Sequence, residues 1–399
     1  MKIKVGVILG GESVEHEVSI ISAVQAMEHM DLEKYDIVPI YISKERTWYT
    51  GEMLKDIDVY KDLNDLKKYA KEVVLVKKQD KFYLQTIKGF LRKDITDIDI
   101  AFPIVHGNNV EDGSIQGYLD SVGIPYVGSG VLGSALGQDK VVMKQLFKSC
   151  DIPIVDYTWF YENEYNDSKE EILKRIKNLS YPVVVKPATL GSSVGITYVK
   201  SDNDIDSAIR EAIKYDVKIV VEKAVDNLVE VNCSVLGDYK FQETSALEEV
   251  LSDNELLTYA DKYIGGSKGK LKGGMKASKG MASASRVIPA RIDKDVKEKI
   301  NDIAKKAFKV LNLSGVVRID FLIDGKTNEV YINEPNTIPG SLSFYLWEPI
   351  GKSYKNLLND MINIAVKNYK NRSKKTYSFD SNILSNYNGF KGAKGKLKR

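Results

Sequence analysis

The sequence predicts an α/β protein with more than one domain. Apolar, strand-like runs alternate with helical patterns through the first two thirds of the chain, and this pattern is typical of a sheet with helices packed against it. The length of 399 residues is enough for roughly two or three domains. A β-hairpin is also predicted near residue 320.

The N-terminal unit, residues 1–128, is predicted to be a βαβ-type domain. Strands are expected at residues 4–9, 37–42 and 98–105, where apolar and β-branched residues are concentrated. The stretch from residue 52 to residue 97 is rich in lysine and aspartate. We interpret that stretch as an excursion from the sheet.

The second unit, residues 129–222, begins near a Gly-Ser-Gly sequence. A helix is predicted from Asp139, because apolar residues recur after it at helical spacing. Strands are predicted at residues 181–186 and 219–222. The apolar positions of the helix are Met143, Leu146, Phe147 and Cys150.

The third unit, residues 223–370, is expected to contain an amphipathic helix that ends near Gly315, and it also carries the hairpin. A basic tail, residues 371–399, follows this unit. The apolar stripe of the helix consists of Val296, Ile300, Ile303, Ala307 and Leu311.

The hairpin near residue 320 has polar side chains on one face. Successive side chains of a strand point to opposite faces, so Arg318 and Asp320 share a face, as do Glu334 and Asn336. If the turn centres near Thr327, Asp320 lies opposite Glu334 and Arg318 lies opposite Asn336. The proline between Glu334 and Asn336 favours an edge strand or a strand end.

This polar face suits a metal ion and a phosphate. Two carboxylates and a carboxamide oxygen are hard ligands of the kind that Mg²⁺ accepts. Arg318 beside them suits an oxyanion or a phosphate. The alternative is a solvated polar face on an ordinary hairpin.

A second candidate phosphate site follows Lys186, which ends an apolar strand. The chain has neither a P-loop nor a well-placed dinucleotide fingerprint. Lys186 is instead followed by a Gly/Ser loop whose N–H groups and hydroxyls can close over phosphates, although a plain hairpin loop has the same composition. Glu222 and Glu230 could accept hydrogen bonds from adenine and ribose, or be surface acids.

Composition narrows the possible partners and location. A formal net charge of +3 does not indicate a nucleic-acid-binding protein. Cys150 and Cys233 fit no metal or redox spacing and are expected to be core residues. No signal sequence or apolar run of membrane-spanning length is recognised, so we expect a cytoplasmic protein with no membrane partner.

The order of several motifs along the chain resembles that of the D-alanine:D-alanine ligases, which belong to the ATP-grasp superfamily. The resemblance implies a three-domain ATP-grasp fold, with ATP held between the central and C-terminal domains. It also implies synthesis of the dipeptide D-Ala-D-Ala for peptidoglycan through an acyl phosphate, and a homodimer. The motifs are Gly10 to Ser19, His106-Gly107 with Glu111-Asp112-Gly113, Asp139-Lys140, Lys186 with 191–195, Glu222-Lys223, Tyr259 to Tyr263, Arg318-Ile319-Asp320 and 333–336.

The resemblance also implies roles for individual residues. Nucleotide-binding residues are implied at Lys140 and Lys186 for the ATP phosphates and at Glu222 and Glu230 for the adenosine, with further contacts from Ser193, Lys223 and Lys262. Metal ligands are implied at Asp320, Glu334 and Asn336, for two Mg²⁺ ions, with Mn²⁺ as an alternative. Substrate and catalytic residues are implied at Glu15, Ser192 and Tyr263 as a hydrogen-bonded triad, at His106 near the first carboxylate, and at Arg318 with the Gly340 N–H for the oxyanion.

The chain departs from the family pattern at three places. The predicted lid, residues 256–285, is longer and richer in glycine and lysine than expected, and Leu256 and Leu257 stand where aromatic residues are usual. Val110 replaces an expected glycine. Tyr345 stands where a serine is expected to bind the carboxylate of the second substrate.

Three alternatives to a D-alanine:D-alanine ligase remain open on the sequence. The second substrate could be D-serine, which differs from D-alanine by one hydroxyl, or D-lactate, although Tyr263 favours the type of ligase that forms a dipeptide. Another ATP-grasp carboxylate–amine ligase would keep the ATP and metal residues without needing Glu15 or Tyr263. A nucleotide-binding regulator without catalysis is disfavoured, because binding alone does not need a complete metal pair with an oxyanion partner.

Overall fold

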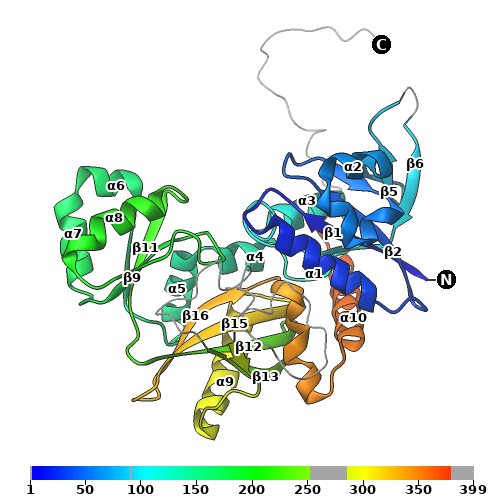
Figure 1. Cartoon of the computed structure of the whole chain (residues 1–399). Coiled ribbons are helices and arrows are strands. Elements are labelled where there is room, and N and C mark those ends of the chain that lie inside the picture. The colour runs from blue at the N-terminus through cyan, green and yellow to red at the C-terminus, as the bar shows by residue number, and fades with distance from the viewer. Residues whose placement is uncertain (1, 90–91, 252–284, 379–399) are drawn as a thin grey trace, which may run out of the picture.

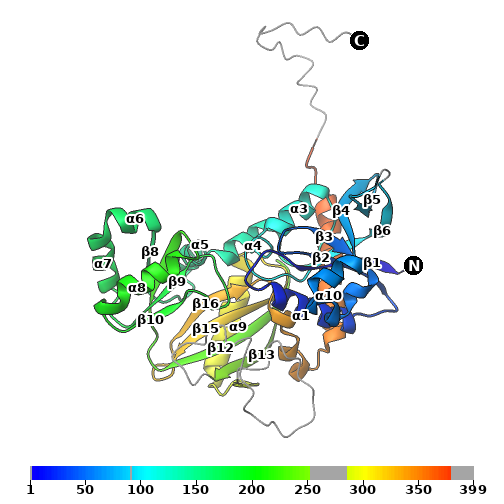
Figure 2. The same cartoon turned by 45° about the horizontal axis from the view of Figure 1, so that its top comes forward.

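The computed structural model describes residues 2–89, 92–251 and 285–378. These residues form three β-sheets, each with its own helices (Figure 1). The sheet of the N-terminal part and the sheet of the central part lie on either side of the third sheet, which follows them in the chain. Figure 2 shows the same arrangement from a second direction.

The N-terminal sheet has seven strands in the order β6-β5-β4-β3-β2-β1-β7. β1 pairs in parallel with β2 and with β7. The other four pairs, β2–β3, β3–β4, β4–β5 and β5–β6, are antiparallel. The strands are β1 Ile3–Gly10, β2 Tyr35–Ile42, β3 Trp48–Thr50, β4 Lys71–Lys78, β5 Lys81–Thr86, β6 Asp94–Ile98 and β7 Ile100–Pro103. Its helices are α1 His16–His29, η1 Glu52–Lys55, η2 Ile57–Lys61, α2 Leu63–Tyr69 and α3 Ser114–Val122.

The structure corrects two predictions in this part of the chain. The stretch 52–97 is not an excursion, because β4, β5 and β6 extend the same sheet. The predicted strand 98–105 is two strands, because the chain changes partner at Asp99: Ile98 pairs with β5, whereas Ile100 pairs with β1.

The central sheet has four antiparallel strands in the order β10-β9-β11-β8. Its strands are β8 Tyr157–Tyr161, β9 Val183–Pro187, β10 Thr197–Val199 and β11 Lys218–Lys223. The helices of this part are α4 Val131–Gln138, α5 Lys140–Ser149, α6 Glu162–Asp167, α7 Lys169–Lys177 and α8 Asp202–Ile213. Apolar side chains of α7 and α8 pack on one face of the sheet and form its core.

The opposite face of the central sheet carries charged side chains. The antiparallel register places Lys186 beside Val220, two residues before Glu222, so Lys186 and Glu222 share a face. The helix predicted from Asp139 is α5, and the Asp139 carboxylate accepts hydrogen bonds from the N–H groups of Val141 and Val142. An aspartate is a preferred N-cap because it satisfies N–H groups that have no partner within the helix.

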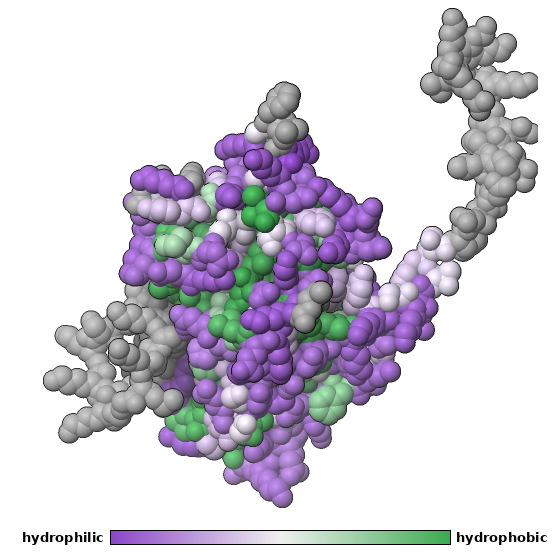
Figure 3. All heavy atoms as spheres, turned by 90° about the vertical axis from the view of Figure 1, so that its right-hand side faces the viewer, coloured by the Kyte–Doolittle hydropathy of each residue, from purple (hydrophilic) through white to green (hydrophobic). Residues whose placement is uncertain are grey.

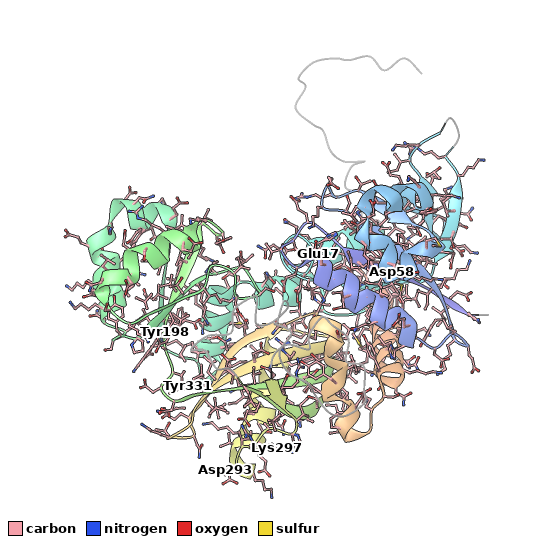
Figure 4. All side chains as sticks on the ribbon, in the orientation of Figure 1. Glu17, Asp58, Tyr198, Asp293, Lys297 and Tyr331 are labelled. Carbon is pink, nitrogen blue, oxygen red and sulfur yellow. The ribbon has the colours of Figure 1, made fainter. Side chains whose placement is uncertain are left out.

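The third sheet has five antiparallel strands in the order β14-β13-β12-β15-β16. Its strands are β12 Leu228–Gly237, β13 Gln242–Leu251, β14 Ser285–Val287, β15 Gly315–Asp324 and β16 Val330–Asn336. Helix α9, Lys294–Val310, buries the predicted apolar stripe against this sheet. Asp293 and Lys297, labelled in Figure 4, mark the N-terminal end of α9.

The predicted hairpin is confirmed as β15 and β16. The register pairs Asp320 with Glu334 and Arg318 with Asn336, as the sequence predicted. β16 is an edge strand, which agrees with the proline at position 335 because proline cannot donate to a central ladder.

The C-terminal elements join the third sheet to the N-terminal part. They are η4 Gly340–Leu346, η5 Glu348–Ile350 and α10 Tyr354–Ser373. Trp347 and Leu358 lie in one hydrophobic core with Ile8 and Leu9 of β1, and Figures 1 and 2 both show α10 beside the N-terminal part. We retain the predicted domain boundaries, after residues 128, 222 and 370, as a proposal.

Several further expectations concern the surface and the cysteines. Cys233 is buried as predicted, whereas Cys150 is only partly buried. The face in Figure 3 is largely hydrophilic, with smaller hydrophobic areas between the polar groups. No helix within the three described ranges is long and apolar enough to cross a membrane. Lys262, Tyr263, most of the predicted lid and most of the predicted tail lie outside the described residues.

Candidate active site

One pocket gathers predicted site residues from all three parts of the chain. It brings together eight of them, which come from the residue before α1, the loops after β7 and β9, α5, and the hairpin with its following segment. These residues are Glu15, His106, Lys140, Ser192, Arg318, Glu334, Asn336 and Gly340. Glu111, Gln138 and Gly191 also line the pocket.

The hairpin holds its polar side chains in a fixed arrangement. Arg318 donates to both carboxylate oxygens of Asp320, from Nε at 2.7 Å and from a terminal nitrogen at 2.8 Å. Asn336 Nδ2 also donates to Asp320, at 3.1 Å. Burial disfavours the Arg318 charge, but Asp320 outweighs this effect and raises the pKa of the guanidinium well above its ordinary value. Arg318 is therefore a fixed cation at one end of the pocket.

Lys140 connects the hairpin to the Gly/Ser loop after β9. Its Nζ lies 3.0 Å from Glu334 Oε2 and donates to the Leu190 carbonyl at 2.9 Å. The preceding residue, Asp139, caps α5 and also pairs with Lys218 Nζ at 2.6 Å. Since the cap fixes the start of the helix, it also fixes where the Lys140 side chain leaves it.

Asp320, Glu334 and Asn336 fit a hard divalent cation by their chemistry. They offer oxygen atoms on facing positions of two paired strands, and oxygen is the ligand type that Mg²⁺ prefers. Arg318 and Lys140 balance the two carboxylates. No group of three or more His, Cys, Asp or Glu side chains suited to a metal occurs among the described residues. This donor set therefore needs phosphate or water oxygens to complete a coordination sphere.

Glu15 and Ser192 form the pair that the sequence predicted. Ser192 Oγ donates to Glu15 Oε1, and Glu15 is buried at the start of α1. The Gly/Ser loop approaches closely here, because a Cβ on Gly191 would lie 3.2 Å from Glu15 Oε2. Tyr263, the third member of the predicted triad, lies outside the described residues.

His106 lines the pocket, and both nitrogens of its ring have protein partners. Nδ1 lies 2.6 Å from the Ile338 carbonyl and Nε2 lies 2.9 Å from Ser22 Oγ. Burial lowers the pKa of His106 to about 4, so the ring is neutral at pH 7. Because a carbonyl only accepts hydrogen bonds, the proton of the neutral ring is on Nδ1. His106 therefore holds the segment that follows β16.

Glu111 holds the same segment from the other side. Its carboxylate accepts from the N–H of Ile338 at 2.8 Å and from Thr337 Oγ1 at 3.1 Å, and also from the N–H of Gly107 at 3.0 Å. Burial, followed by the charge of Glu15, raises the pKa of Glu111 to about 7. Together, His106 and Glu111 fix both the N–H and the carbonyl of Ile338, midway between Asn336 and Gly340.

The residues after Gly340 are also held by α1. Ser341, Leu342 and Ser343 have φ values of 50°, 52° and 52°, a left-handed backbone region that side-chain-bearing residues rarely adopt. The Ser341 N–H donates to Ser22 Oγ at 2.9 Å and the Ser341 hydroxyl donates to Gln25 Oε1 at 2.6 Å. These contacts fix the direction of the Gly340 backbone relative to the pocket.

Glu222, predicted to contact adenosine, lies between two buried lysines. Lys186 Nζ donates to Glu222 Oε2 at 2.7 Å and to Asn333 Oδ1 at 3.3 Å. Lys144 Nζ lies 3.1 Å from Glu222 Oε1. Burial alone would raise the pKa of Glu222, but the two lysines outweigh it and hold the pKa at about 2. Glu222 is thus an anion that is shared between Lys144 and Lys186.

Four other predicted residues, Ser193, Lys223, Glu230 and Tyr345, do not line this pocket. Ser193 and Glu230 are partly exposed and Lys223 is exposed. Tyr345 donates to Glu248 Oε2 at 3.1 Å, and the Arg286 guanidinium lies over the Tyr345 ring at 4.5 Å. Arg286 also pairs with Glu248 at 3.1 Å. Tyr345 is therefore part of an ordered cluster beside the hairpin.

Sequence reasoning assigned no role to Lys144 or to Glu111. Lys144 follows Lys140 by four residues in a predicted helix, so a shared face could have been read from the spacing. Glu111 appeared in a recognised motif, but its three hydrogen bonds join segments that are far apart in the chain. No local pattern reports such contacts.

The fold and the site together place this chain in the ATP-grasp class of ligases. Its fold, with three sheets, is similar to that of solved ligase structures, and its pocket is lined by an acidic hairpin and by Lys140. The N-terminal family model of the D-Ala-D-Ala ligases matches residues 4–129, and the C-terminal model matches residues 146–363. The chain belongs to the D-alanine–D-alanine ligase family.

Individual relatives support this assignment. A D-alanine–D-alanine ligase of Thermosipho melanesiensis is 41% identical, covering 96% of this chain and 98% of the relative. One of Caldicellulosiruptor bescii is 40% identical, covering 95% and 98%. The structure of the D-alanine-D-alanine ligase from Coxiella burnetii has a TM-score of 0.76 at 28% identity, covering 94% of this chain and 96% of that one. The VanG D-Ala:D-Ser ligase from Enterococcus faecalis has a TM-score of 0.74 at 30% identity, covering 92% and 100%.

Proposed function

We propose that this protein joins two D-alanines into D-Ala-D-Ala at the expense of ATP, for peptidoglycan precursors. The observation that carries the proposal is that one pocket collects Glu15, Lys140, Arg318, Glu334 and Gly340 from three parts of the chain. The relatives of the previous section carry the name of this activity over nearly the full length of the chain.

The reaction needs an activated carboxylate, because a free carboxylate is a poor acyl donor. In the first step a carboxylate oxygen of one D-alanine attacks the γ-phosphorus of ATP, the bond to the bridging oxygen breaks, and ADP leaves. We assign Lys140 and Lys186 to the phosphate oxygens, where their positive charges would offset the negative charge that moves through them. We assign Glu15, which accepts a hydrogen bond from Ser192, to the ammonium group of this D-alanine.

In the second step the amine of another D-alanine, after losing a proton, attacks the acyl carbon. The C–N bond forms, the C–O bond to phosphate breaks, and phosphate leaves with the electron pair. Arg318 and the Gly340 N–H are the donors that we assign to the oxyanion of the tetrahedral intermediate. Asp320 orients Arg318 through two hydrogen bonds, and His106 and Glu111 position the segment that leads to Gly340.

Asp320, Glu334 and Asn336 are the residues that we assign to two Mg²⁺ ions, or to Mn²⁺ in their place. When bound, such ions supply positive charge that stabilises negative charge on the phosphoryl groups. We also propose a cytoplasmic location, because the reaction consumes ATP, and a homodimer, as the family resemblance implies.

A D-alanine:D-serine ligase is the second candidate function. The similarity to VanG favours it, as does Tyr345 at the position where the family resemblance implies a serine that binds the carboxylate of the second substrate. D-lactate as acceptor has no comparable support from the structure.

The test is phosphate release from ATP by the purified protein in the presence of Mg²⁺. D-Alanine is supplied either as the sole amino acid or together with an equal concentration of D-serine or D-lactate. Products are identified by mass spectrometry. D-Ala-D-Ala as the main product in every mixture supports the proposal. A dominant D-Ala-D-Ser or D-Ala-D-Lac product reassigns the acceptor, and ATP binding without any D-amino-acid-dependent phosphate release contradicts the ligase assignment.

A further inference from the structure

Lys144 is a fully buried lysine beside the proposed nucleotide site, and the reaction steps above do not use it. Its side chain is 0% exposed. It lies on α5 one turn after Lys140, so the two lysines leave the helix on the same side. A buried lysine is costly unless a specific partner requires its charge. The partner in this structure is Glu222. Burial lowers the pKa of Lys144 from its ordinary value, whereas the Glu222 carboxylate acts in the opposite direction and favours the charged form.

The Glu222 carboxylate is divided between two lysines. Its Oε1 faces Lys144 Nζ at 3.1 Å, and its Oε2 accepts from Lys186 Nζ at 2.7 Å. Lys186 is less deeply buried, with a side chain that is 9% exposed, and it also donates to Asn333 of β16. The three groups therefore run from the interior of the central part toward the hairpin, in the order Lys144, Glu222, Lys186.

The net charge of this row of three groups, Lys144, Glu222 and Lys186, determines how strongly Lys186 attracts an anionic ligand. With Lys144 present, two cations and one anion leave one net positive charge. Without it, Glu222 and Lys186 form a neutral pair in a buried environment where charges interact strongly. Tyr157, whose ring lies 5.8 Å from Lys144 Nζ, carries no formal charge to replace it. Lys144 thus determines whether the row is neutral or cationic.

We propose that Lys144 is a positioning residue for the nucleotide. It offsets the charge of Glu222, so that Lys186 is held in place by Glu222 and still presents a net positive charge to the phosphates of ATP. Lys144 itself contacts no substrate, because it is fully buried. The inference rests on the proposed function in one respect, which is that ATP is the ligand of Lys186.

The first experiment is Lys144→Gln, which removes the charge that pairs with Glu222 but keeps polar N–H groups at this position. The Kd and KM for ATP are expected to rise about tenfold, while the KM for D-alanine changes by less than about twofold. The matched control is Lys148→Gln, which removes an exposed lysine from the same helix. A merely structural ion pair would lower thermal stability without this selective effect on ATP. An unchanged Kd for ATP in folded Lys144→Gln overturns the proposal.

The second experiment asks whether Lys144 acts through Glu222. In a Glu222→Gln background the remaining lysines are cationic with or without Lys144, so adding Lys144→Gln is expected to change the Kd for ATP by less than about threefold. An equally large loss in both backgrounds overturns the proposal. This comparison also serves if Lys144→Gln alone does not fold, because the double variant removes both buried charges together. A tenfold loss in the double variant relative to Glu222→Gln then contradicts the proposal.

Binding of ATP with Mg²⁺ is measured by calorimetry without D-alanine, so the outcome does not depend on ligation. If the unmodified protein binds ATP but forms no dipeptide, the proposed function fails while the test of Lys144 still stands. If the unmodified protein forms the dipeptide and Lys144→Gln binds ATP equally well, the inference about Lys144 fails and the proposed function stands.

Discussion

Replacing Glu111 with glutamine is expected to change how stability depends on pH. Glu111 accepts three hydrogen bonds in a buried position, and burial together with the charge of Glu15 raises its pKa from 4.5 to about 7. The folded protein therefore binds this proton more tightly than the unfolded chain does. The stabilisation from this group is fully present below pH 4.5 and is lost as pH rises through about 7.

The magnitude follows from the difference between the two pKa values. At 1.36 kcal/mol for each pKa unit, the loss amounts to about 3 kcal/mol between pH 4.5 and pH 7.5. Glu111→Gln removes the titrating group and also leaves the Gly107 N–H facing an amide donor, which costs about 1–3 kcal/mol at every pH. The unmodified protein should consequently be more stable than the variant at low pH, and this advantage should shrink as pH rises.

The assay is urea unfolding of the ligand-free protein and of Glu111→Gln at several pH values from 4.5 to 7.5. Glu348→Gln is the control, because it removes a carboxylate that is exposed. We expect the difference in the free energy of unfolding to fall by about 3 kcal/mol across this range. A difference that stays constant to within about 0.5 kcal/mol refutes the reasoning.

Three further predictions follow from the site. Arg318→Lys loses the two-point contact with Asp320, so kcat should fall about 100- to 1,000-fold with a smaller change in either KM; steady-state kinetics check this, and a kcat within about threefold of the unmodified value contradicts it. Burial lowers the pKa of His106 from 6.5 to about 4, so its contribution to stability is lost as pH falls through this range. The difference in the free energy of unfolding between the unmodified protein and His106→Gln should therefore increase by about 3 kcal/mol from pH 4 to pH 6.5. Urea unfolding measures this difference, and a difference that does not change with pH contradicts the prediction. Chelation of divalent cations with EDTA should abolish phosphate release, and added Mg²⁺ or Mn²⁺ should restore it; activity that persists in EDTA contradicts the assignment of Asp320, Glu334 and Asn336.

The hairpin illustrates what sequence alone can predict. Its strands are continuous in the chain, its faces follow from a period of two, and the turn fixes its register. The pairing of Asp320 with Glu334 could therefore be predicted and is confirmed. The start of α5 at Asp139 was predictable for the same reason, because capping is a local interaction.

Features that depend on contacts between distant segments could not be predicted in this way. In β4 the buried Val73 and Leu75 alternate with the partly buried Val74 and Val76, and the charged residues lie at the ends of the strand, so the abundance of lysine and aspartate obscured that period. The contacts from Lys144 through Glu222 to Lys186 join a helix and two strands. The hydrogen bonds of His106 and Glu111 to Ile338 join the loop after β7 to a segment more than 200 residues later. Only the fold brings such groups together.

The central claim is that this site makes a peptide bond through an acyl phosphate of D-alanine. The most direct test supplies D-alanine with both carboxylate oxygens labelled with ¹⁸O, together with ATP and Mg²⁺, and analyses the products by mass spectrometry. The account predicts one ¹⁸O atom in each released phosphate and an equal amount of D-Ala-D-Ala, because the attacking oxygen leaves with the phosphate. Dipeptide accompanied by unlabelled phosphate, or phosphate released without dipeptide, would contradict it.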